Sequence, residues 1–191
     1  MGLKIVAGSA KGRKLRGPKT KGIRPAAARV RESLFQILGN LEGLRVLDLF
    51  AGTGSMGLEA LSRGADSVVF VDPNQAAVSL LFHNLGVTKF LDRAHVLKKK
   101  ANLAIEFLHK KGDRYDLIFL DPPYDRGFVD GTLKQLHRFP LLNEDGLLLC
   151  EHSPREIPSF LSGLEVSDER KYGQTTVTFL KPRAMGGSSK E

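Results

Sequence analysis

From residue 45 onward, short apolar runs alternate with longer amphipathic stretches, and this alternation restricts the chain to very few folds. The apolar runs predict strands at residues 46–50, 68–71, 94–97, 117–120 and 147–150. The amphipathic stretches predict helices at residues 55–63, 75–85, 103–111 and 129–139. Strands that are apolar throughout must be covered on both faces. The pattern therefore predicts a parallel sheet between two layers of helices.

The alternation stops near residue 164. Residues 164–166 and 175–180 predict two further strands, which are joined through Gly173 with no helix between them. Strands connected in this way pair antiparallel, and we expect them at one edge of the sheet. The sequence thus predicts an α/β, Rossmann-like fold with a mostly parallel seven-stranded sheet and an antiparallel edge hairpin.

The segment before the sheet is organised differently. Residues 4–7 and 13–15 flank a glycine-containing turn and predict a short N-terminal β-hairpin. A Gly/Pro/Lys linker follows, and a helix is expected from just after Pro25 to near Gly39, with Val30, Leu34 and Ile37 on its buried face. We therefore divide the chain into a hairpin and linker at residues 1–24, a main domain at residues 25–183 and a disordered tail at residues 184–191.

The positive charge of the chain is concentrated at its beginning. The net charge is +8, but residues 1–31 contain ten lysines and arginines and no acidic residue. The remaining 160 residues carry a net charge of −2. Such a concentration is typical of a surface that binds a polyanion, although a cationic tail that only improves solubility remains an alternative.

Cysteine and histidine usage narrows the class further. Cys150 is the single cysteine and lies in an apolar run, so it predicts a buried thiol in a reducing, cytoplasmic setting. The five histidines have no spacing typical of a metal site, and we predict no metal. No apolar run is long enough to span a bilayer, so we expect no membrane partner.

A glycine-rich loop lies between the first strand and the first helix of the sheet region. Gly52, Gly54 and Gly57 have the G-x-G-x-x-G spacing that lets a nucleotide-like ligand approach the backbone. Asp72 follows the second strand, where a carboxylate binds a ribose diol in NAD(H) or in S-adenosylmethionine. Asp48 places an acid beside the loop, which favours the cationic S-adenosylmethionine over a pyrophosphate.

The fourth strand ends in Asp121-Pro122-Pro123-Tyr124. Two prolines cannot continue the strand ladder, so a carboxylate, free carbonyl oxygens and an aromatic ring gather at the edge where ligands bind in α/β sheets. The oxygens can accept hydrogen bonds from an exocyclic amine, and Tyr124 can stack on the ring that carries it. This pattern is typical of amino-group methyltransferases. A plain Pro-rich strand exit is the alternative.

Taken in order, these motifs resemble the RsmD family, the bacterial 16S rRNA guanine-N2 methyltransferases. The resemblance rests on Ile5-Val-Ala-Gly8, Arg24-Pro25, Arg29-Val-Arg-Glu-Ser-Leu-Phe35, the loop at residues 48–63, Asp121-Pro-Pro-Tyr124 and Tyr172-Gly-Gln-Thr175. It implies a Rossmann-like class I methyltransferase domain that modifies one guanine in a protein-containing assembly intermediate of the small subunit. The chain departs from the family in having Ala28 before Arg29, and Lys100-Ala101 after the third strand.

The resemblance and the motifs together define the predicted site. We predict catalytic roles for Asp121, Pro122, Pro123 and Tyr124. We predict cofactor contacts from Asp48, Phe50, Ala51, Gly52, Thr53, Gly54, Asp72, Ala101 and Asp121. We predict RNA contacts from Lys11, Arg13, Lys14, Arg24, Arg29 and Arg31.

The expected activity is methyl transfer from S-adenosylmethionine to the N2 amine of a guanine in 16S rRNA, by a cytoplasmic monomer. An adenine-N6 methyltransferase acting on RNA or DNA remains an alternative, because the Pro-Pro motif does not identify its base. A non-catalytic RNA-binding assembly factor and a dinucleotide oxidoreductase are the other classes considered. Asp121 and the intact glycine loop favour the methyltransferase.

Overall fold

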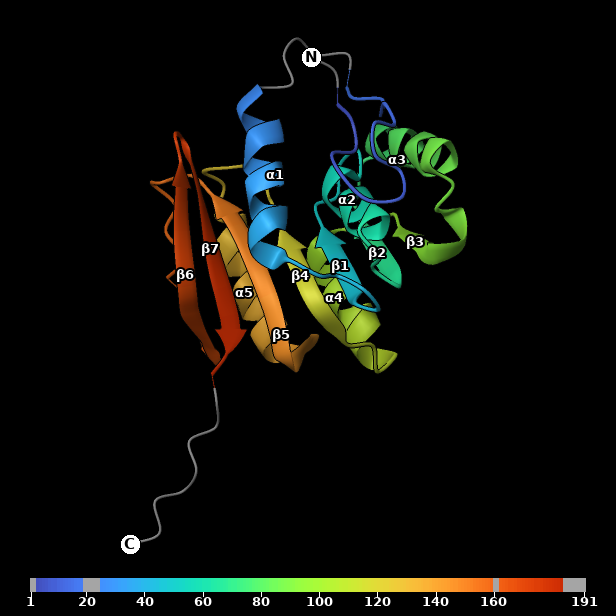
Figure 1. Ribbon diagram of the computed structural model, residues 1–191. Helices are drawn as coiled ribbons and strands as arrows, with labels where there is room; N and C mark the ends of the chain where they lie inside the picture. Colours follow the sequence, from blue (N-terminus) through green and yellow to red (C-terminus); the bar gives the residue numbers. More distant parts are fainter. Residues whose placement is uncertain (1–2, 19–24, 160–161, 184–191) are drawn as a thin grey trace, which may run out of the picture.

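The computed structural model describes residues 3–18, 25–159 and 162–183 and contains one seven-stranded sheet (Figure 1). Its strands are β1 (Arg45–Leu49), β2 (Ser67–Val71), β3 (Ala94–Leu97), β4 (Tyr115–Leu120), β5 (Leu142–His152), β6 (Leu164–Tyr172) and β7 (Thr175–Pro182). Its helices are α1 (Pro25–Leu38), α2 (Ser55–Ser62), α3 (Gln75–Thr88), α4 (Ala101–Lys110) and α5 (Phe128–Arg138), with a 3-10 turn at Leu91–Arg93.

The order of the strands is β3-β2-β1-β4-β5-β7-β6. The first five strands are parallel, and β7 pairs antiparallel with both β5 and β6. Gly173, at a φ of 63°, lies in the tight turn between β6 and β7. The predicted Rossmann-like α/β fold, with its antiparallel hairpin at the edge, is confirmed. The hairpin strands are longer than the sequence predicted, because exposed polar residues extend both of them beyond their apolar centres.

Helices cover both faces of the sheet (Figure 1). One core cluster joins α1, α2 and α3 to one face, and a second joins α4 and α5 to the other. Cys150 is fully buried in the second cluster, as predicted. Since each βα connection crosses the sheet in this way, the carboxyl ends of β1, β2, β4 and β5 meet at a single edge, where a ligand can reach all of them.

The helix α1 covers the sheet with a slightly different face from the one predicted. Val30, Leu34 and Phe35 are buried, whereas Ile37 is 44% exposed. The predicted place of Ile37 on the buried face is therefore wrong, because Phe35 packs against Phe119 of β4 and fixes the rotation of the helix. None of the described helices combines the length and the apolar character needed to cross a membrane.

The N-terminal segment turns back on itself as the predicted hairpin does, but it forms a single β-bridge, between Lys4 and Lys14. Its remaining backbone groups bond to α2 instead. The carboxylate of Glu59 accepts hydrogen bonds from the amides of Val6 and Ala7, at 2.8 and 3.0 Å. The amide of Ser9 donates to the carbonyl of Ser62. The segment is therefore docked on the helix rather than extended as a regular two-stranded ladder.

Apolar side chains of this segment complete the docking. Leu3, Ile5, Ala10 and Leu15 are buried in the same core cluster as α1 and the sheet. The predicted division of the chain at residue 24 stays a prediction, and the linker at residues 19–24 lies outside the described residues. The predicted disordered tail at residues 184–191 lies outside them as well.

Candidate active site

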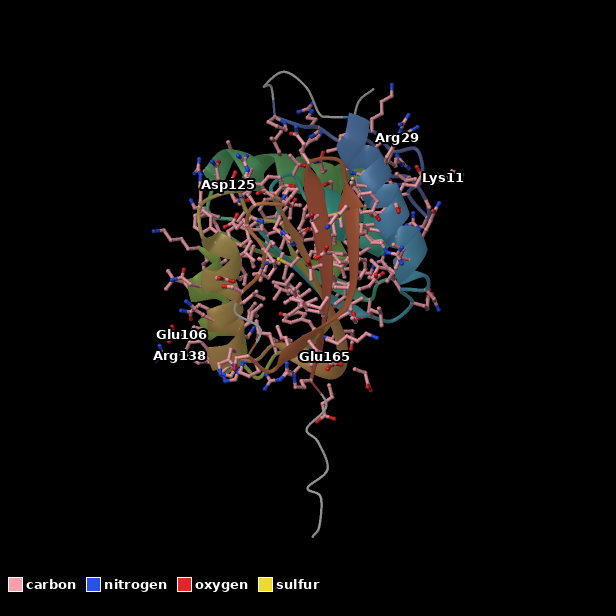
Figure 2. All side chains as sticks on the ribbon, turned by 90° about the vertical axis from the view of Figure 1, so that its left-hand side faces the viewer. Lys11, Arg29, Glu106, Asp125, Arg138 and Glu165 are labelled. Atoms are coloured by element: carbon pink, nitrogen blue, oxygen red, sulfur yellow. The ribbon has the colours of Figure 1, made fainter. Side chains whose placement is uncertain are left out.

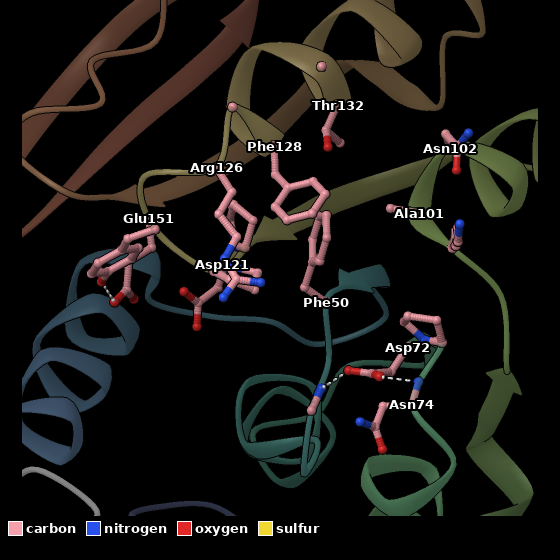
Figure 3. A pocket seen from close by; sticks show the side chains of 18 of the residues that line it. Phe50, Asp72, Asn74, Ala101, Asn102, Asp121, Arg126, Phe128, Thr132 and Glu151 are labelled. Atoms are coloured by element: carbon pink, nitrogen blue, oxygen red, sulfur yellow. Dashed lines mark hydrogen bonds between the residues drawn. The ribbon is translucent and has the colours of Figure 1, made fainter.

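A cavity of about 1240 Å³ opens at the carboxyl edge of the sheet (Figure 3). It extends from the end of β2, across the ends of β1 and β4, to the end of β5. It is lined by Phe50, Gly52, Asp72, Pro73, Asn74, Ala77, Lys100, Ala101, Asn102, Asp121, Pro122, Pro123, Tyr124, Arg126, Gly127, Phe128, Gly131, Thr132, Gln135 and Glu151. The two motifs that the sequence singled out, the glycine loop and the Pro-Pro turn, therefore face one space.

The glycines of the loop have two different functions. Gly52, at a φ of 54°, lines the cavity, and a Cβ atom added there would meet no atom closer than 4.0 Å. A Cβ atom on Gly54 or Gly57 would collide at 2.3 Å with Leu81 or Phe70. Only Gly52 thus gives a ligand access to the backbone, while the other two allow α2 to pack closely on the sheet.

Asp72 holds the loop and the end of β2 together. Its carboxylate accepts one hydrogen bond from the amide of Gly52, at 2.9 Å, and another from the amide of Asn74, at 2.8 Å (Figure 3). Asn74 in turn caps α3 by accepting from the amides of Ala76 and Ala77. Each carboxylate oxygen keeps a second lone pair toward the cavity, as a ribose diol requires.

Asp48 lies beneath the loop and does not line the cavity. It is 2% exposed, and its carboxylate accepts a hydrogen bond from the amide of Gly57 at 3.0 Å. Burial raises the pKa of Asp48 to about 7, against a smaller opposing effect of the Gly57 bond and with a further contribution from Asp72. Its predicted direct contact with a cofactor stays a prediction. From its position it acts on a bound cation through its charge.

Asp121 follows β4 directly and is exposed to the cavity. In the described part of the chain its carboxylate accepts no hydrogen bond and pairs with no lysine or arginine. Desolvation by the surrounding protein, followed by the charges of Glu151 and Asp48, raises the pKa of Asp121 well above its usual range. An unsatisfied acceptor is thus directed at the point where a substrate would sit.

Tyr124, at the end of the Pro-Pro turn, is half-buried and lines the same cavity. Its hydroxyl donates to Oε1 of Glu151 at 2.7 Å and lies 3.0 Å from the hydroxyl oxygen of Thr175. These bonds tie the ring to β5 and β7. The ring is therefore held in a fixed position, which a stacking surface requires.

Glu151 was not predicted as a site residue. It follows Cys150 at the end of β5 and lines the cavity beside the turn. The same argument that selected Asp121 and Asp72, an acidic residue at the carboxyl end of an apolar parallel strand, would have found it. Phe50 and Phe128 form another feature that the sequence did not predict as a unit: their rings lie 5.7 Å apart on the cavity wall. Ala101 begins α4 and lines the cavity, as its predicted adenine contact requires.

The predicted RNA-binding residues separate into two groups. Lys11, Arg13, Lys14 and Arg29 are exposed, and Figure 2 shows Lys11 and Arg29 projecting from the side of the molecule that carries α1. Arg24 lies outside the described residues. Arg31 does not fit this set.

The side chain of Arg31 is only 5% exposed and serves the interior of the protein. Its guanidinium donates to the carbonyl of Lys4 at 2.7 Å, and its Nε lies 3.9 Å from the carboxylate of Glu59. A phosphate cannot reach a group that is engaged and covered in this way. The sequence could not show this, because Arg31 is one of ten cations in a segment without acids.

No ligand-like metal cluster accompanies these residues. Within residues 3–18, 25–159 and 162–183, no group of three or more histidine, cysteine, aspartate or glutamate side chains could hold a metal ion. The chemistry of the cavity is therefore that of carboxylates, backbone amides and aromatic rings. Such a set suits a cationic nucleoside next to an amine, because the carboxylates attract the cation and accept hydrogen bonds from the amine.

Comparison with known proteins agrees with this geometry. A family described as "Conserved hypothetical protein 95" matches residues 3–181. The chain is 34% identical to "Putative rRNA methyltransferase YlbH" of Bacillus subtilis, over 95% of this chain and 100% of that protein. It is 32% identical to "Ribosomal RNA small subunit methyltransferase D" of Escherichia coli, over 97% and 93% of the two chains.

A solved structure shows the same likeness in three dimensions. "Putative methyltransferase yhhF from Escherichia coli" superposes with a TM-score of 0.81 at 30% identity, over 95% of this chain and 98% of that chain. The match covers both ends of the candidate site, from the docked N-terminal segment to the edge hairpin. The chain therefore belongs to the RsmD family of ribosomal RNA methyltransferases.

Proposed function

We propose that this protein transfers a methyl group from S-adenosylmethionine to the N2 amine of a guanine in the 16S rRNA of the small ribosomal subunit. The observation that carries the proposal is the free carboxylate of Asp121 in a cavity that also contains Gly52 and Asp72. These residues combine an acceptor for an amine with a cradle for a nucleoside. Membership of the rRNA methyltransferase family supports the substrate class.

The residues present fit the cofactor. Asp72 offers oxygens to the ribose diol, Gly52 leaves the backbone open, and the acidic surroundings of Asp48 and Asp121 stabilise a positive charge. Phe50 and Ala101 border the space beyond the ribose, where an adenine ring would lie. Bound S-adenosylmethionine would supply an electrophilic methyl group on a cationic sulfur.

The acceptor side of the reaction relies on positioning. The guanine amine is a weak nucleophile because its lone pair is delocalised into the ring. Hydrogen bonds from its protons to the Asp121 carboxylate and the Pro122 carbonyl favour a pyramidal nitrogen with its lone pair directed at the methyl group. The new C–N bond forms as the C–S bond breaks, and the bonding pair stays on sulfur. The cationic amine then releases a proton, which Asp121, with its raised pKa, is suited to receive.

Tyr124 supplies the stacking surface for the target base, which must leave its helix or loop to enter the cavity. The exposed cations Lys11, Arg13, Lys14 and Arg29 hold the RNA backbone. We propose that the substrate is a protein-containing assembly intermediate rather than free RNA, and that the enzyme acts as a cytoplasmic monomer.

The decisive experiment maps methylated nucleotides in 16S rRNA from cells with and without this gene. We expect one N2-methylguanine to disappear with the gene, to return with the wild-type protein, and to stay absent with Asp121→Ala. Asp145→Asn, which removes a charge from an exposed position on β5, is the matched control and should restore the modification. A missing N6-methyladenine, or an unchanged methylation map, would refute the proposal.

A further inference from the structure

Glu151 and Asp121 occupy equivalent positions on neighbouring strands. Leu120 of β4 pairs with Cys150 of β5 in the parallel register, and the two acids are the next residues on each strand. Since adjacent strands lie about 5 Å apart, the two carboxylates stand beside each other at the edge of the sheet. Figure 3 shows them on the same side of the cavity.

This pair has more acceptor oxygens than the protein itself satisfies. Oε1 of Glu151 accepts the Tyr124 hydroxyl. Within the described ranges, Oε2 of Glu151 and both oxygens of Asp121 accept no hydrogen bond, and no lysine or arginine pairs with either acid. Two adjacent carboxylates without donors destabilise each other, so the site is arranged for a ligand that brings several donors.

Both carboxylates can be approached from two sides. A second cavity of about 210 Å³, between α1 and the start of α2, touches the large cavity at two shared residues, Asp121 and Glu151. The pair thus forms a wall between two spaces. A wall of this kind can contact a bound base while it also faces the cofactor.

The edge of guanine supplies what this wall lacks. Guanine presents N1–H and the two N2 protons side by side, and all of them are donors. Adenine presents its N6 protons beside N1, which is an acceptor and is repelled by a carboxylate. One acid can serve the amine of either base, whereas a second acid beside it distinguishes the two.

We infer that Glu151 is a specificity-determining residue that accepts the guanine N1–H while Asp121 accepts the N2 protons, so that guanine is selected over bases with an unprotonated N1. This inference rests on the proposed function and identifies the base by its chemistry. Tyr124 has a positioning role here, because its hydroxyl holds Glu151 in place through a bond that Thr175 steadies.

The test compares guanine with 2-aminopurine at the mapped position of an otherwise identical small-subunit particle. 2-Aminopurine keeps the N2 amine but has an unprotonated N1. Single-turnover methyl transfer by the wild-type enzyme should favour guanine by about 10-fold to 100-fold, as expected when a charged hydrogen bond is lost. In Glu151→Gln the side-chain amide can donate to the unprotonated N1, so the preference should shrink at least about 10-fold.

The ratio between the two enzymes cancels the other difference between the bases, the missing O6. Glu144→Gln is the matched control, because it removes the same charge from an exposed position at the other end of β5 and should keep the wild-type preference. Tyr124→Phe keeps the charge of Glu151 but removes its hydrogen bond, and it should reduce the preference partially. Normal cofactor binding by calorimetry would show that each variant is folded.

The outcomes separate the two proposals. If the wild-type enzyme transfers no methyl group to guanine, the proposed function fails. If it methylates guanine but Glu151→Gln and Tyr124→Phe keep its full preference, the inference alone is overturned. An equal loss of transfer to both bases in Glu151→Gln would assign Glu151 to the chemical step and would also overturn the selective role.

Discussion

Replacing Asp48 with asparagine should stabilise the free protein at alkaline pH while weakening cofactor binding. The carboxylate is 2% exposed and accepts one hydrogen bond, from the Gly57 amide. The folded-state pKa of Asp48, about 7, lies above the unfolded value of 3.8. The folded protein therefore binds an extra proton between these two values. Stability from this group is complete below about pH 4 and is lost as pH rises toward 7.

The size of the effect follows from this difference in pKa. One pKa unit corresponds to about 1.4 kcal/mol, so ionising Asp48 in the folded state costs roughly 4 kcal/mol at pH 8. Asparagine avoids this cost but accepts a weaker hydrogen bond from Gly57, a loss of about 1 kcal/mol. We expect a net gain of about 2–3 kcal/mol in the free energy of unfolding at pH 8, and little or none at pH 4.5.

Urea unfolding of both proteins at the two pH values measures the difference. Because other carboxyl groups titrate in both proteins, only the difference between wild type and variant is informative. Asp145→Asn removes an exposed charge and should change stability little at either pH. Cofactor titration at pH 8 should show weaker binding to Asp48→Asn. Equal stability of the variant and the wild type at both pH values would refute the reasoning.

Three further outcomes are expected. Asp72→Ala should weaken S-adenosylmethionine binding by about 1–3 kcal/mol in calorimetry, because a charged acceptor is lost; unchanged affinity would exclude the ribose contact. Asp121→Ala should abolish single-turnover transfer and leave cofactor affinity within a few-fold, and a near-normal rate would contradict its role. Joint replacement of Lys11, Arg13 and Lys14 by alanine should reduce the log–log salt slope of RNA binding by about 0.7 to 0.9 per lost contact. An unchanged slope would mean that these cations only improve solubility.

These substitutions test the basic segment better than its deletion would. Leu3, Ile5 and Leu15 are part of the core, and the amides of Val6 and Ala7 satisfy the carboxylate of Glu59. Removing the segment would expose apolar surface of α2 and leave a charge of Glu59 buried without donors. Loss of RNA binding could then not be distinguished from loss of the fold.

The sequence predicted those parts of the site that follow from strand order. In a parallel sheet every strand delivers its last residue to the same edge, so Asp72 and Asp121 could be placed together from their positions after apolar runs. Glu151 follows the same rule and was overlooked because the Pro-Pro signature is absent from its strand. The expected pairing of the N-terminal hairpin was only partly correct, since its amides bond to Glu59, a residue more than fifty positions away in the sequence.

Asp48 and Glu59 show how hydrogen bonding separates a functional acid from a structural one. Both are almost completely buried, and neither type of position can be recognised from residue type alone. Glu59 receives two backbone amides and the Nε of Arg63 at 2.9 Å, and Arg31 lies next to it, so its charge is matched within the protein. Asp48 receives a single amide, and its uncompensated charge raises the energy of the free enzyme. A cationic cofactor supplies the missing partner, so the strain of burying Asp48 is relieved only when the site is filled.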